Sequence, residues 1–351
     1  MARHRGKLKL KPLREQVIVI TGATSGIGLS TARAAAARGA RLLLAARNGD
    51  ALKDVCHDLR NRGADVAYCV TDVGDADHVR RLAEQAVERF GGFDTWVNNA
   101  GVSIFGDVTR VPLEDQRKLF DTNYWGVVHG SLTAVEHLRN RPAGGTVINV
   151  GSVLGDLAIP TQGAYSASKH AVRGFTNALR MELMEQKAPI AVTHIKPSAI
   201  DTPYKDHARN YTGHPVRNPA PIYATPLVAQ AILYAAEHPV REMTVGGGGV
   251  LQTLAWSAWP HAMERALARF TPRMSTDRSG RKVVHSDNLH EAGQDLRERS
   301  YYPKVRETSL FSTVQMRPLA TVGVAALAMA GVGAAYHLGR KRKRPTTLNA
   351  A

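Results

Sequence analysis

The chain has 351 residues, a length that suits one large folded domain with added segments at its ends. Its formal net charge is +16, but much of the excess basic charge lies in two terminal stretches, residues 1–14 and 340–344. A nucleic-acid footprint needs basic residues on a folded face, interleaved with aromatic residues, so this distribution argues against nucleic acid as a partner. With only Cys56 and Cys69, the chain has neither a disulfide framework nor a cysteine-based metal site, and we expect no metal.

The start of the chain predicts no export. Residues 1–14 form a basic arm, and the apolar run that follows, Val17 to Ile20, is shorter than the core of a signal peptide. We therefore expect a catalytic domain that faces the cytoplasm. Two interpretations of the arm stay open, a solvated tail and an attachment to an anionic membrane surface.

Short apolar runs alternate with longer amphipathic segments, which predicts a parallel sheet covered by helices on both faces. The expected strands are Val17–Thr21, Arg41–Ala45, Val66–Val70, Thr95–Asn98, Thr146–Val150, Ile190–Ile195 and Met243–Val245. An alanine-rich helix ends before Gly39, and a long helix beginning near Leu113 ends at Pro142. The fold class is α/β, a Rossmann-type doubly wound parallel sheet in a single catalytic domain over residues 15–262.

The first expected strand leads into a glycine-rich turn, residues 21–28, and then directly into a helix. Glycine permits a tight turn and lets a pyrophosphate approach the amides of the helix N-terminus. A glycine triplet alone is also an ordinary turn, but its place after a first strand indicates dinucleotide binding. The residues expected to bind the cofactor here are Gly22, Ser25, Gly26, Ile27 and Gly28.

The end of the second strand distinguishes the two nicotinamide cofactors, because an acid there bonds the ribose hydroxyls and an arginine pairs with a 2′-phosphate. Arg47 follows this strand and no acid stands at its end, so NADP(H) is favoured over NAD(H). The alternative is that Arg47 is only a surface charge. Asp72, followed by Val73, is expected beside the adenine, a role compatible with capping the next helix.

The expected chemistry is carried by three residues that follow the fifth strand, Ser152, Tyr165 and Lys169. Tyr165 and Lys169 are four residues apart, so they share a helix face and the ammonium can lie beside the phenol. A neighbouring cation favours the phenolate and makes tyrosine a better acid/base near neutral pH. Ser152, at the carboxyl end of a strand, can hydrogen-bond a substrate oxygen.

A tyrosine and a lysine at this spacing arise by chance on many helices. Together with the glycine turn, Ser152, the run Asn98 to Gly101 and Asn123, the pattern resembles the short-chain dehydrogenase/reductase family over Leu13 to Gly249. The resemblance implies that Tyr165 is the catalytic acid/base and that Lys169 binds the nicotinamide ribose. It further implies that Ser152 orients the substrate carbonyl and that Asn123 holds a water linking the lysine to solvent.

The resemblance also assigns residues that would line the cofactor. These are Asn99, Ala100 and Gly101 after the fourth strand, and Pro197, Ile200 and Thr202 after the sixth, while Asn98 would brace the sheet. Thr202 would contact the carboxamide. Ser198 stands where the family usually has glycine, which puts the geometry of this loop in question.

We expect an NADP-preferring oxidoreductase of the short-chain alcohol dehydrogenase/carbonyl reductase type, interconverting a carbonyl and a secondary alcohol. Residues 204–226 are expected to cover the pocket, and their aromatic residues fit a lipophilic alcohol or ketone, although ordinary packing explains them as well. The alternative function is a catalytically silent, membrane-associated module that binds a dinucleotide as a sensor. A homo-oligomer is implied by the resemblance.

The C-terminal part divides into a polar connector, 263–317, an apolar segment, 318–339, and a basic tail, 340–351. Residues 319–338 carry no formal charge and match the ~20 residues that a helix needs to cross a bilayer. A spanning helix, an interfacial helix and a soluble dimerisation helix all remain open. One span cannot keep both the basic tail and the catalytic domain in the cytoplasm. We therefore expect membrane association with a cytoplasmic catalytic domain, spanning or not.

Overall fold

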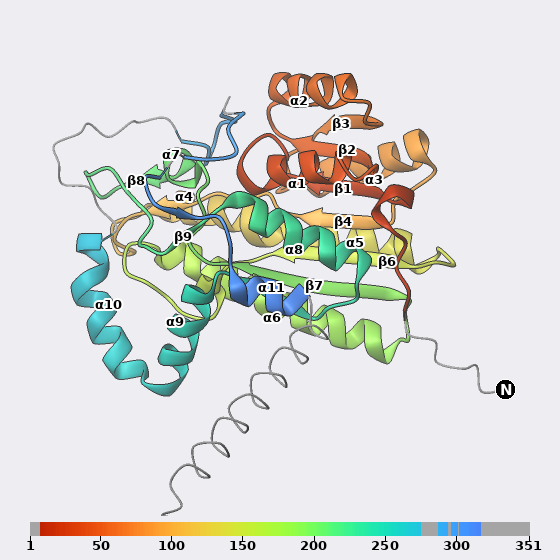
Figure 1. The fold of residues 1–351 in the computed structure, drawn as a ribbon. Helices are drawn as coiled ribbons and strands as arrows, with labels where there is room; N and C mark the ends of the chain where they lie inside the picture. The colour runs from red at the N-terminus through yellow and green to blue at the C-terminus, as the bar shows by residue number, and fades with distance from the viewer. Residues whose placement is uncertain (1–7, 275–286, 294–295, 301, 317–351) are drawn as a thin grey trace, which may run out of the picture.

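A computed structural model describes residues 8–274, 287–293, 296–300 and 302–316. Seven parallel strands form the central sheet in the order β10-β7-β6-β4-β1-β2-β3 (Figure 1). Their bounds are β1 Val17–Thr21, β2 Arg41–Ala46, β3 Val66–Val70, β4 Thr95–Asn98, β6 Gly145–Val150, β7 Ile190–Pro197 and β10 Glu242–Val245. The predicted doubly wound α/β fold is confirmed, and each expected strand forms within two residues of its expected ends.

Helices cover both faces of the sheet (Figure 1). On one face lie α1 Gly26–Ala36, α2 Gly49–Asn61 and α8 Thr225–Glu237, and on the other α3 Ala76–Phe90, α5 Gly126–Arg139 and α6 Gly163–Glu185. Leu29 and Ile232 belong to the core of the first face, and Leu82 and Leu179 to that of the second. A fully buried side chain of this size contributes about 1.5–3 kcal/mol, so the two cores hold the helices on the sheet.

The strand order reverses beside β1. The chain adds β2 and β3 on one side of β1, then crosses back to place β4 and the later strands on the other side. The connections that leave the carboxyl ends of β1 and β4 therefore diverge, and they open a crevice at this edge of the sheet. Residues that follow the strands at this edge are the ones positioned to bind a ligand.

The long helix predicted from Leu113 is divided by a wider turn. Helix α4 Leu113–Phe120 passes through a π-helical turn, Asp121–Trp125, into α5. Such turns are rare and often occur at functional sites. Here the turn carries Asn123, which is fully buried.

The remaining elements are short or lie at the periphery. They are 3₁₀ turns at Leu13–Glu15 and Val153–Gly155, strands β5 Ile104–Phe105, β8 Arg209–Asn210, β9 Ile222–Tyr223 and β11 Val305–Arg306, and helices α7 Tyr204–His207, α9 Gly247–Ala258, α10 Pro260–Met274 and α11 Leu310–Met316.

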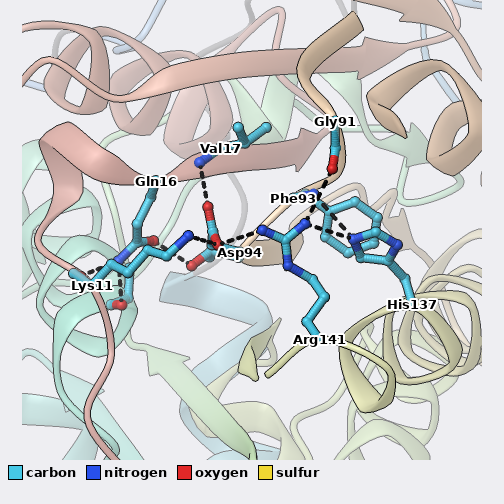
Figure 2. Close-up of polar contacts among 10 residues, drawn as sticks. Lys11, Gln16, Val17, Gly91, Phe93, Asp94, His137 and Arg141 are labelled. Atoms are coloured by element: carbon cyan, nitrogen blue, oxygen red, sulfur yellow. Dashed lines mark hydrogen bonds and ion pairs between the residues drawn. The ribbon is translucent and has the colours of Figure 1, made fainter. Parts of the chain in front are cut away.

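The described part of the basic N-terminal arm is packed against the domain rather than solvated. At the amino ends of β1 and β4, Asp94 Oδ1 accepts from Lys11 Nζ at 2.7 Å and from Arg141 Nη2 at 3.2 Å (Figure 2). Its Oδ2 accepts from the backbone N–H of Val17 at 2.9 Å. Leu13 is buried nearby. Residues 10–13 are therefore attached to the amino ends of the central strands, at the end of the sheet opposite the crevice.

Part of the polar connector expected over 263–317 contacts the catalytic domain. Strand β11 pairs with β9, and Gln315 exchanges two hydrogen bonds with the backbone of Thr244 in β10. The carbonyl of Arg297 accepts from the N–H of Gly26 at 3.0 Å. Because main-chain and polar contacts hold this segment, no hydrophobic periodicity marks it in the sequence.

None of the helices within the described ranges is long and apolar enough to span a membrane. The expected apolar helix, 318–339, and the basic tail, 340–351, lie outside the described residues, as do residues 1–7.

Candidate active site

A cavity of about 420 Å³ lies in the crevice at the carboxyl ends of the strands. Most of the predicted site residues line it: Gly22, Ser25, Gly26, Ile27, Arg47, Asp72, Val73, Asn99, Ala100, Gly101, Ser152, Tyr165, Lys169, Pro197, Ile200 and Thr202. Gly28 and Asn123 are the two that do not. Their contacts, described below, place them behind the cavity wall.

The glycine turn has no room for a side chain at Gly22 or Gly28, because the backbone packs closely there. Gly22 has a φ of +65°, and a Cβ on it would lie 2.8 Å from the Cα of Ala100. A Cβ on Gly28 would lie 2.0 Å from the carbonyl oxygen of Gly22. Thr21 Oγ1 accepts from the backbone N–H groups of Asn99 and Ala100 at 3.0 and 3.1 Å, which joins the turn to the end of β4. This cradle at a helix N-terminus fits a dinucleotide pyrophosphate.

The predicted tyrosine and lysine lie together in the first turns of α6. Lys169 Nζ is 5.6 Å from the centre of the Tyr165 ring and donates to the carbonyl of Val150 at 3.1 Å. Burial raises the pKa of Tyr165 to about 12, although hydrogen bonds with Ser152 and Tyr204 act in the opposite direction. Burial also lowers the pKa of Lys169 to about 8. Without a ligand, Tyr165 is therefore a neutral phenol at neutral pH, in the state that can donate a proton.

Ser152 comes directly after β6 and reaches Tyr165. Its hydroxyl caps a 3₁₀ turn by accepting from the N–H of Leu154 at 3.1 Å, and it hydrogen-bonds the phenol of Tyr165. The backbone fixes this hydroxyl before any substrate binds. A substrate oxygen lying between Ser152 and Tyr165 would contact two hydroxyl groups. Such hydrogen-bond donors stabilise the negative charge that develops on a carbonyl oxygen during the reaction.

Asn123 and Asn98 are structural neighbours of the cavity. Asn123 exchanges two hydrogen bonds with the backbone of Val102 and donates to Ser168 Oγ at 3.1 Å. It thus ties the π-helical turn to α6, and the water-holding role implied by the family stays a prediction. Asn98 donates to Asn149 Oδ1 in β6 at 2.8 Å and accepts from Trp96, so it lies in a position to brace the sheet.

Three residues that were not predicted as catalytic or cofactor-binding form a hydrogen-bonded group beside Tyr165. Tyr204, expected only as part of the cover, shares a hydrogen bond with Ser103 Oγ at 2.6 Å and accepts from Gln162 Nε2 at 2.8 Å. Its ring meets that of Tyr165 edge to face at 5.5 Å. Gln162, immediately before α6, and Ser103, two residues after Gly101, are both buried. Their closeness in sequence to known motif residues was the available signal.

The adenosine end of the cavity carries Asp72 and Arg47. Burial alone would raise the pKa of Asp72, but the N–H of Gly74 and the ammonium of Lys118 outweigh it and lower that pKa. The carboxylate is therefore charged and fixed. Arg47 points into the same region, and its guanidinium donates to backbone carbonyls of residues 288–291.

Serine at position 198 does not distort its loop. Among the described residues, the non-glycine positions with positive φ are Thr161 and Lys187, so Ser198 adopts no conformation that requires glycine. Its hydroxyl donates to the carbonyl of Val245 at 2.8 Å. The loop that carries Ile200 and Thr202 is thereby tied to the end of β10.

Comparisons with known proteins agree with this geometry. The family model described as short chain dehydrogenase matches residues 16–212. The chain belongs to the short-chain dehydrogenase/reductase family. It is 43% identical to the uncharacterized oxidoreductase YxnA of Bacillus subtilis over 317 residues, covering 87% of this chain and 89% of the relative.

Two solved structures of the family share the fold. A short-chain dehydrogenase/reductase from Burkholderia phymatum in complex with NAD matches with a TM-score of 0.65 and 25% identity, covering 74% of this chain and 97% of that one. An alcohol dehydrogenase from the archaeon Thermococcus sibiricus, complexed with 5-hydroxy-NADP, matches with a TM-score of 0.58 and 27% identity, covering 66% and 95%. The protein is thus an oxidoreductase of the short-chain dehydrogenase/reductase type.

Proposed function

We propose that the protein is an NADP(H)-dependent enzyme that interconverts a carbonyl and a secondary alcohol on a lipophilic substrate, as an alcohol dehydrogenase or carbonyl reductase does. One observation carries the proposal. Tyr165, Lys169 and Ser152 meet in the wall of a single cavity that also contains the glycine turn. A dinucleotide held by that turn and a substrate held by those hydroxyls would share the same space.

A bound nicotinamide supplies or accepts the hydride. In reduction, Ser152 and Tyr165 donate hydrogen bonds to the substrate oxygen, and the Tyr165 phenol gives it a proton as the charge on that oxygen grows. Lys169 lies beside the phenol, where its positive charge stabilises the phenolate that remains. In oxidation the same phenolate removes the proton from the alcohol.

The preference for NADP(H) rests on charge at the end of β2. Arg47 lines the cavity there, and Ala45 and Ala46 before it carry no acid that would repel a 2′-phosphate. A guanidinium binds a phosphate through two parallel hydrogen bonds. Arg47 therefore favours NADP(H) over NAD(H).

A lipophilic substrate is supported by the opposite end of the cavity. Leu154 and Leu157 line it from the segment after β6, and Met263, Leu267 and Phe270 line it from α10. Apolar walls around a few directed polar groups are typical of sites for small apolar ligands. The geometry disfavours a catalytically silent sensor, since dinucleotide binding alone needs no hydrogen-bonded Ser152–Tyr165 pair in the cavity wall.

Two further proposals concern partners. Membrane association through residues 319–338 follows from their length and lack of charge. A homo-oligomer is supported by exposed apolar side chains on α5 and α6, among them Leu132, Met181 and Met184. Light scattering of the purified protein tests the second.

The substrate class is tested by screening lipophilic ketones with NADPH, and lipophilic alcohols with NADP⁺, while following the absorbance of the reduced nicotinamide. We expect turnover with a subset of these compounds and little with small hydrophilic ones. Turnover confined to NADH or to hydrophilic substrates would refute the finer parts of the proposal. Tight dinucleotide binding without any turnover would favour the sensor.

A further inference from the structure

A short segment from the C-terminal part of the chain crosses the adenosine end of the cavity. This segment, residues 287–293, is called the strap below. Asn288, Ala292 and Gly293 line the cavity together with Arg47 and Asp72. The strap therefore borders the place where the second ribose of a dinucleotide would lie.

The strap holds the guanidinium of Arg47 by its backbone. Arg47 Nη1 donates to the carbonyls of Leu289 and His290, both at 3.2 Å. Nη2 donates to the carbonyl of Glu291 at 3.1 Å and to that of Asn288. The four Nη hydrogens of the guanidinium thus have four carbonyl acceptors. Asn48, the next residue, donates to the carbonyl of Gly293 at 2.9 Å.

The other side of the strap is attached to β8 and α4. Asp287 pairs with Arg209 Nε at 2.7 Å, and His290 Nε2 lies 2.7 Å from Asp115 Oδ1. Leu289 is fully buried in a small core with residues of the β4–α4 connection and α4. These contacts, together with those of Arg47, hold the strap in place.

The same guanidinium hydrogens would be needed by a 2′-phosphate. A bidentate phosphate contact uses two parallel N–H donors, and here each Nη donor already faces a strap carbonyl. Phosphate and strap therefore compete for Arg47. NAD(H), which has only a hydroxyl at this position, does not require the strap to release the arginine.

We propose that the strap is a specificity determinant for the cofactor: it competes with the 2′-phosphate for Arg47, so that NADP(H) binds with release of Arg47 from the strap and NAD(H) binds with the strap in place. This inference rests on the proposed role of Arg47 in NADP(H) binding. The direction of the effect follows from thermodynamic linkage. Weakening the strap lowers the free-energy cost of binding NADP(H) and leaves the cost of binding NAD(H) unchanged.

The test measures the dissociation constants of NADPH and NADH by their fluorescence, in the full chain, with variants that weaken the strap from its far side. Asp287→Asn removes the ion pair with Arg209 but keeps an oxygen that can accept from the N–H of Leu289. His290→Ala removes the contact with Asp115. Asp77→Asn, which breaks an exposed ion pair with Arg80 on α3, is the matched control.

In each strap variant we expect the ratio of NADPH affinity to NADH affinity to rise about two- to ten-fold. This is the change that the loss of one polar contact typically produces. The control should leave the ratio unchanged. Equal changes for both cofactors, or no change, would overturn the role of the strap.

A second measurement uses the unaltered protein. The amides of Asn288 and Leu289 are bonded to the carbonyl of His207 and to Asp287 Oδ1. Their hydrogen exchange should be faster with saturating NADP⁺ than with saturating NAD⁺, and equal or slower exchange contradicts the proposal.

The variant Arg47→Ala separates the proposed cofactor preference from the proposed role of the strap. If Arg47→Ala leaves the ratio of NADPH affinity to NADH affinity unchanged, the proposed cofactor preference is wrong. If it lowers this affinity ratio while the strap variants do not raise it, only the strap inference fails.

Discussion

At the scale of single residues, burial controls the ionisation of the paired tyrosines. Burial raises the pKa of Tyr165 to about 12, and the hydrogen bond with Tyr204 partly offsets this rise. Tyr204→Phe keeps the edge-to-face ring contact but removes that hydrogen bond, so the pKa of Tyr165 should rise further. We expect kcat for alcohol oxidation to fall about two- to ten-fold and its pH profile to shift to higher pH. An unchanged pH profile would show that Tyr204 only fills space.

His194 in β7 predicts a pH dependence of stability. Burial lowers its pKa to about 3, with the charge of Glu242 opposing and that of Lys196 reinforcing the shift. The unfolded chain binds its proton near pH ~6.5, so it holds more protons than the folded chain between the two values. The free energy of unfolding should therefore fall as the pH drops below ~6.5, by up to about 1.4 kcal/mol per pH unit.

Urea unfolding between pH 4.5 and 7.5 is the measurement for His194, with His194→Leu as the comparison. Above pH ~5 the leucine variant should lose most of the slope, leaving the smaller part due to His137, whose pKa burial also lowers. Below pH ~5, carboxylates with a lowered pKa, such as Asp72, add a slope that both proteins share. Equal slopes in both proteins would assign the effect to other groups.

At the scale of elements, glycine-to-alanine substitutions at two helical positions are expected to have opposite effects on stability. Gly28→Ala in α1 would place a Cβ 2.0 Å from the carbonyl oxygen of Gly22, so the turn must move. We expect lower stability and at least a ten-fold loss in dinucleotide affinity, about 1.4 kcal/mol. Gly174→Ala in α6 meets nothing within 4 Å and should stabilise the protein by about 0.5–1 kcal/mol without changing affinity. Thermal unfolding and cofactor titration of both variants check this; intact binding in Gly28→Ala would contradict the assigned turn.

The same scale explains what could be predicted from sequence. The seven strands were predictable because each is a short apolar run bounded by turn residues, although β3 is buried only at its first two residues. Most of the expected site residues could be placed at one cavity because they lie beyond the carboxyl ends of those strands. The contact between Arg47 and residues 288–291 was not predictable. Its acceptors are backbone carbonyls, which every residue carries, and they lie more than 240 positions away in sequence. The buried carboxylate of Asp94, which fixes the N-terminal arm, went unrecognised for the same long-range reason.

At the scale of the whole molecule, the last described contacts of the domain lie just before the apolar segment. Gln315 bonds the backbone of β10, and Met316 packs against the core. A chain truncated after Arg317 should therefore keep the sheet, the cavity and activity. We expect it in the supernatant of lysed cells, and the full chain with the membranes even at high salt, because buried apolar surface is not screened.

Fractionation followed by an activity assay is the measurement for the truncated chain. Full-length protein in the supernatant without detergent would mean that residues 319–338 serve as an oligomerisation helix. Loss of activity on truncation would mean that this segment completes the fold or the substrate cavity.

The central claim is that Tyr165 exchanges the proton that accompanies hydride transfer. The most direct measurement is the turnover of Tyr165→Phe beside its affinity for NADPH. The phenyl ring keeps its packing but has no proton to give, so we predict a fall in kcat of about 10²- to 10⁴-fold with nearly unchanged NADPH binding. A variant that keeps more than a few per cent of the original turnover would contradict the mechanism.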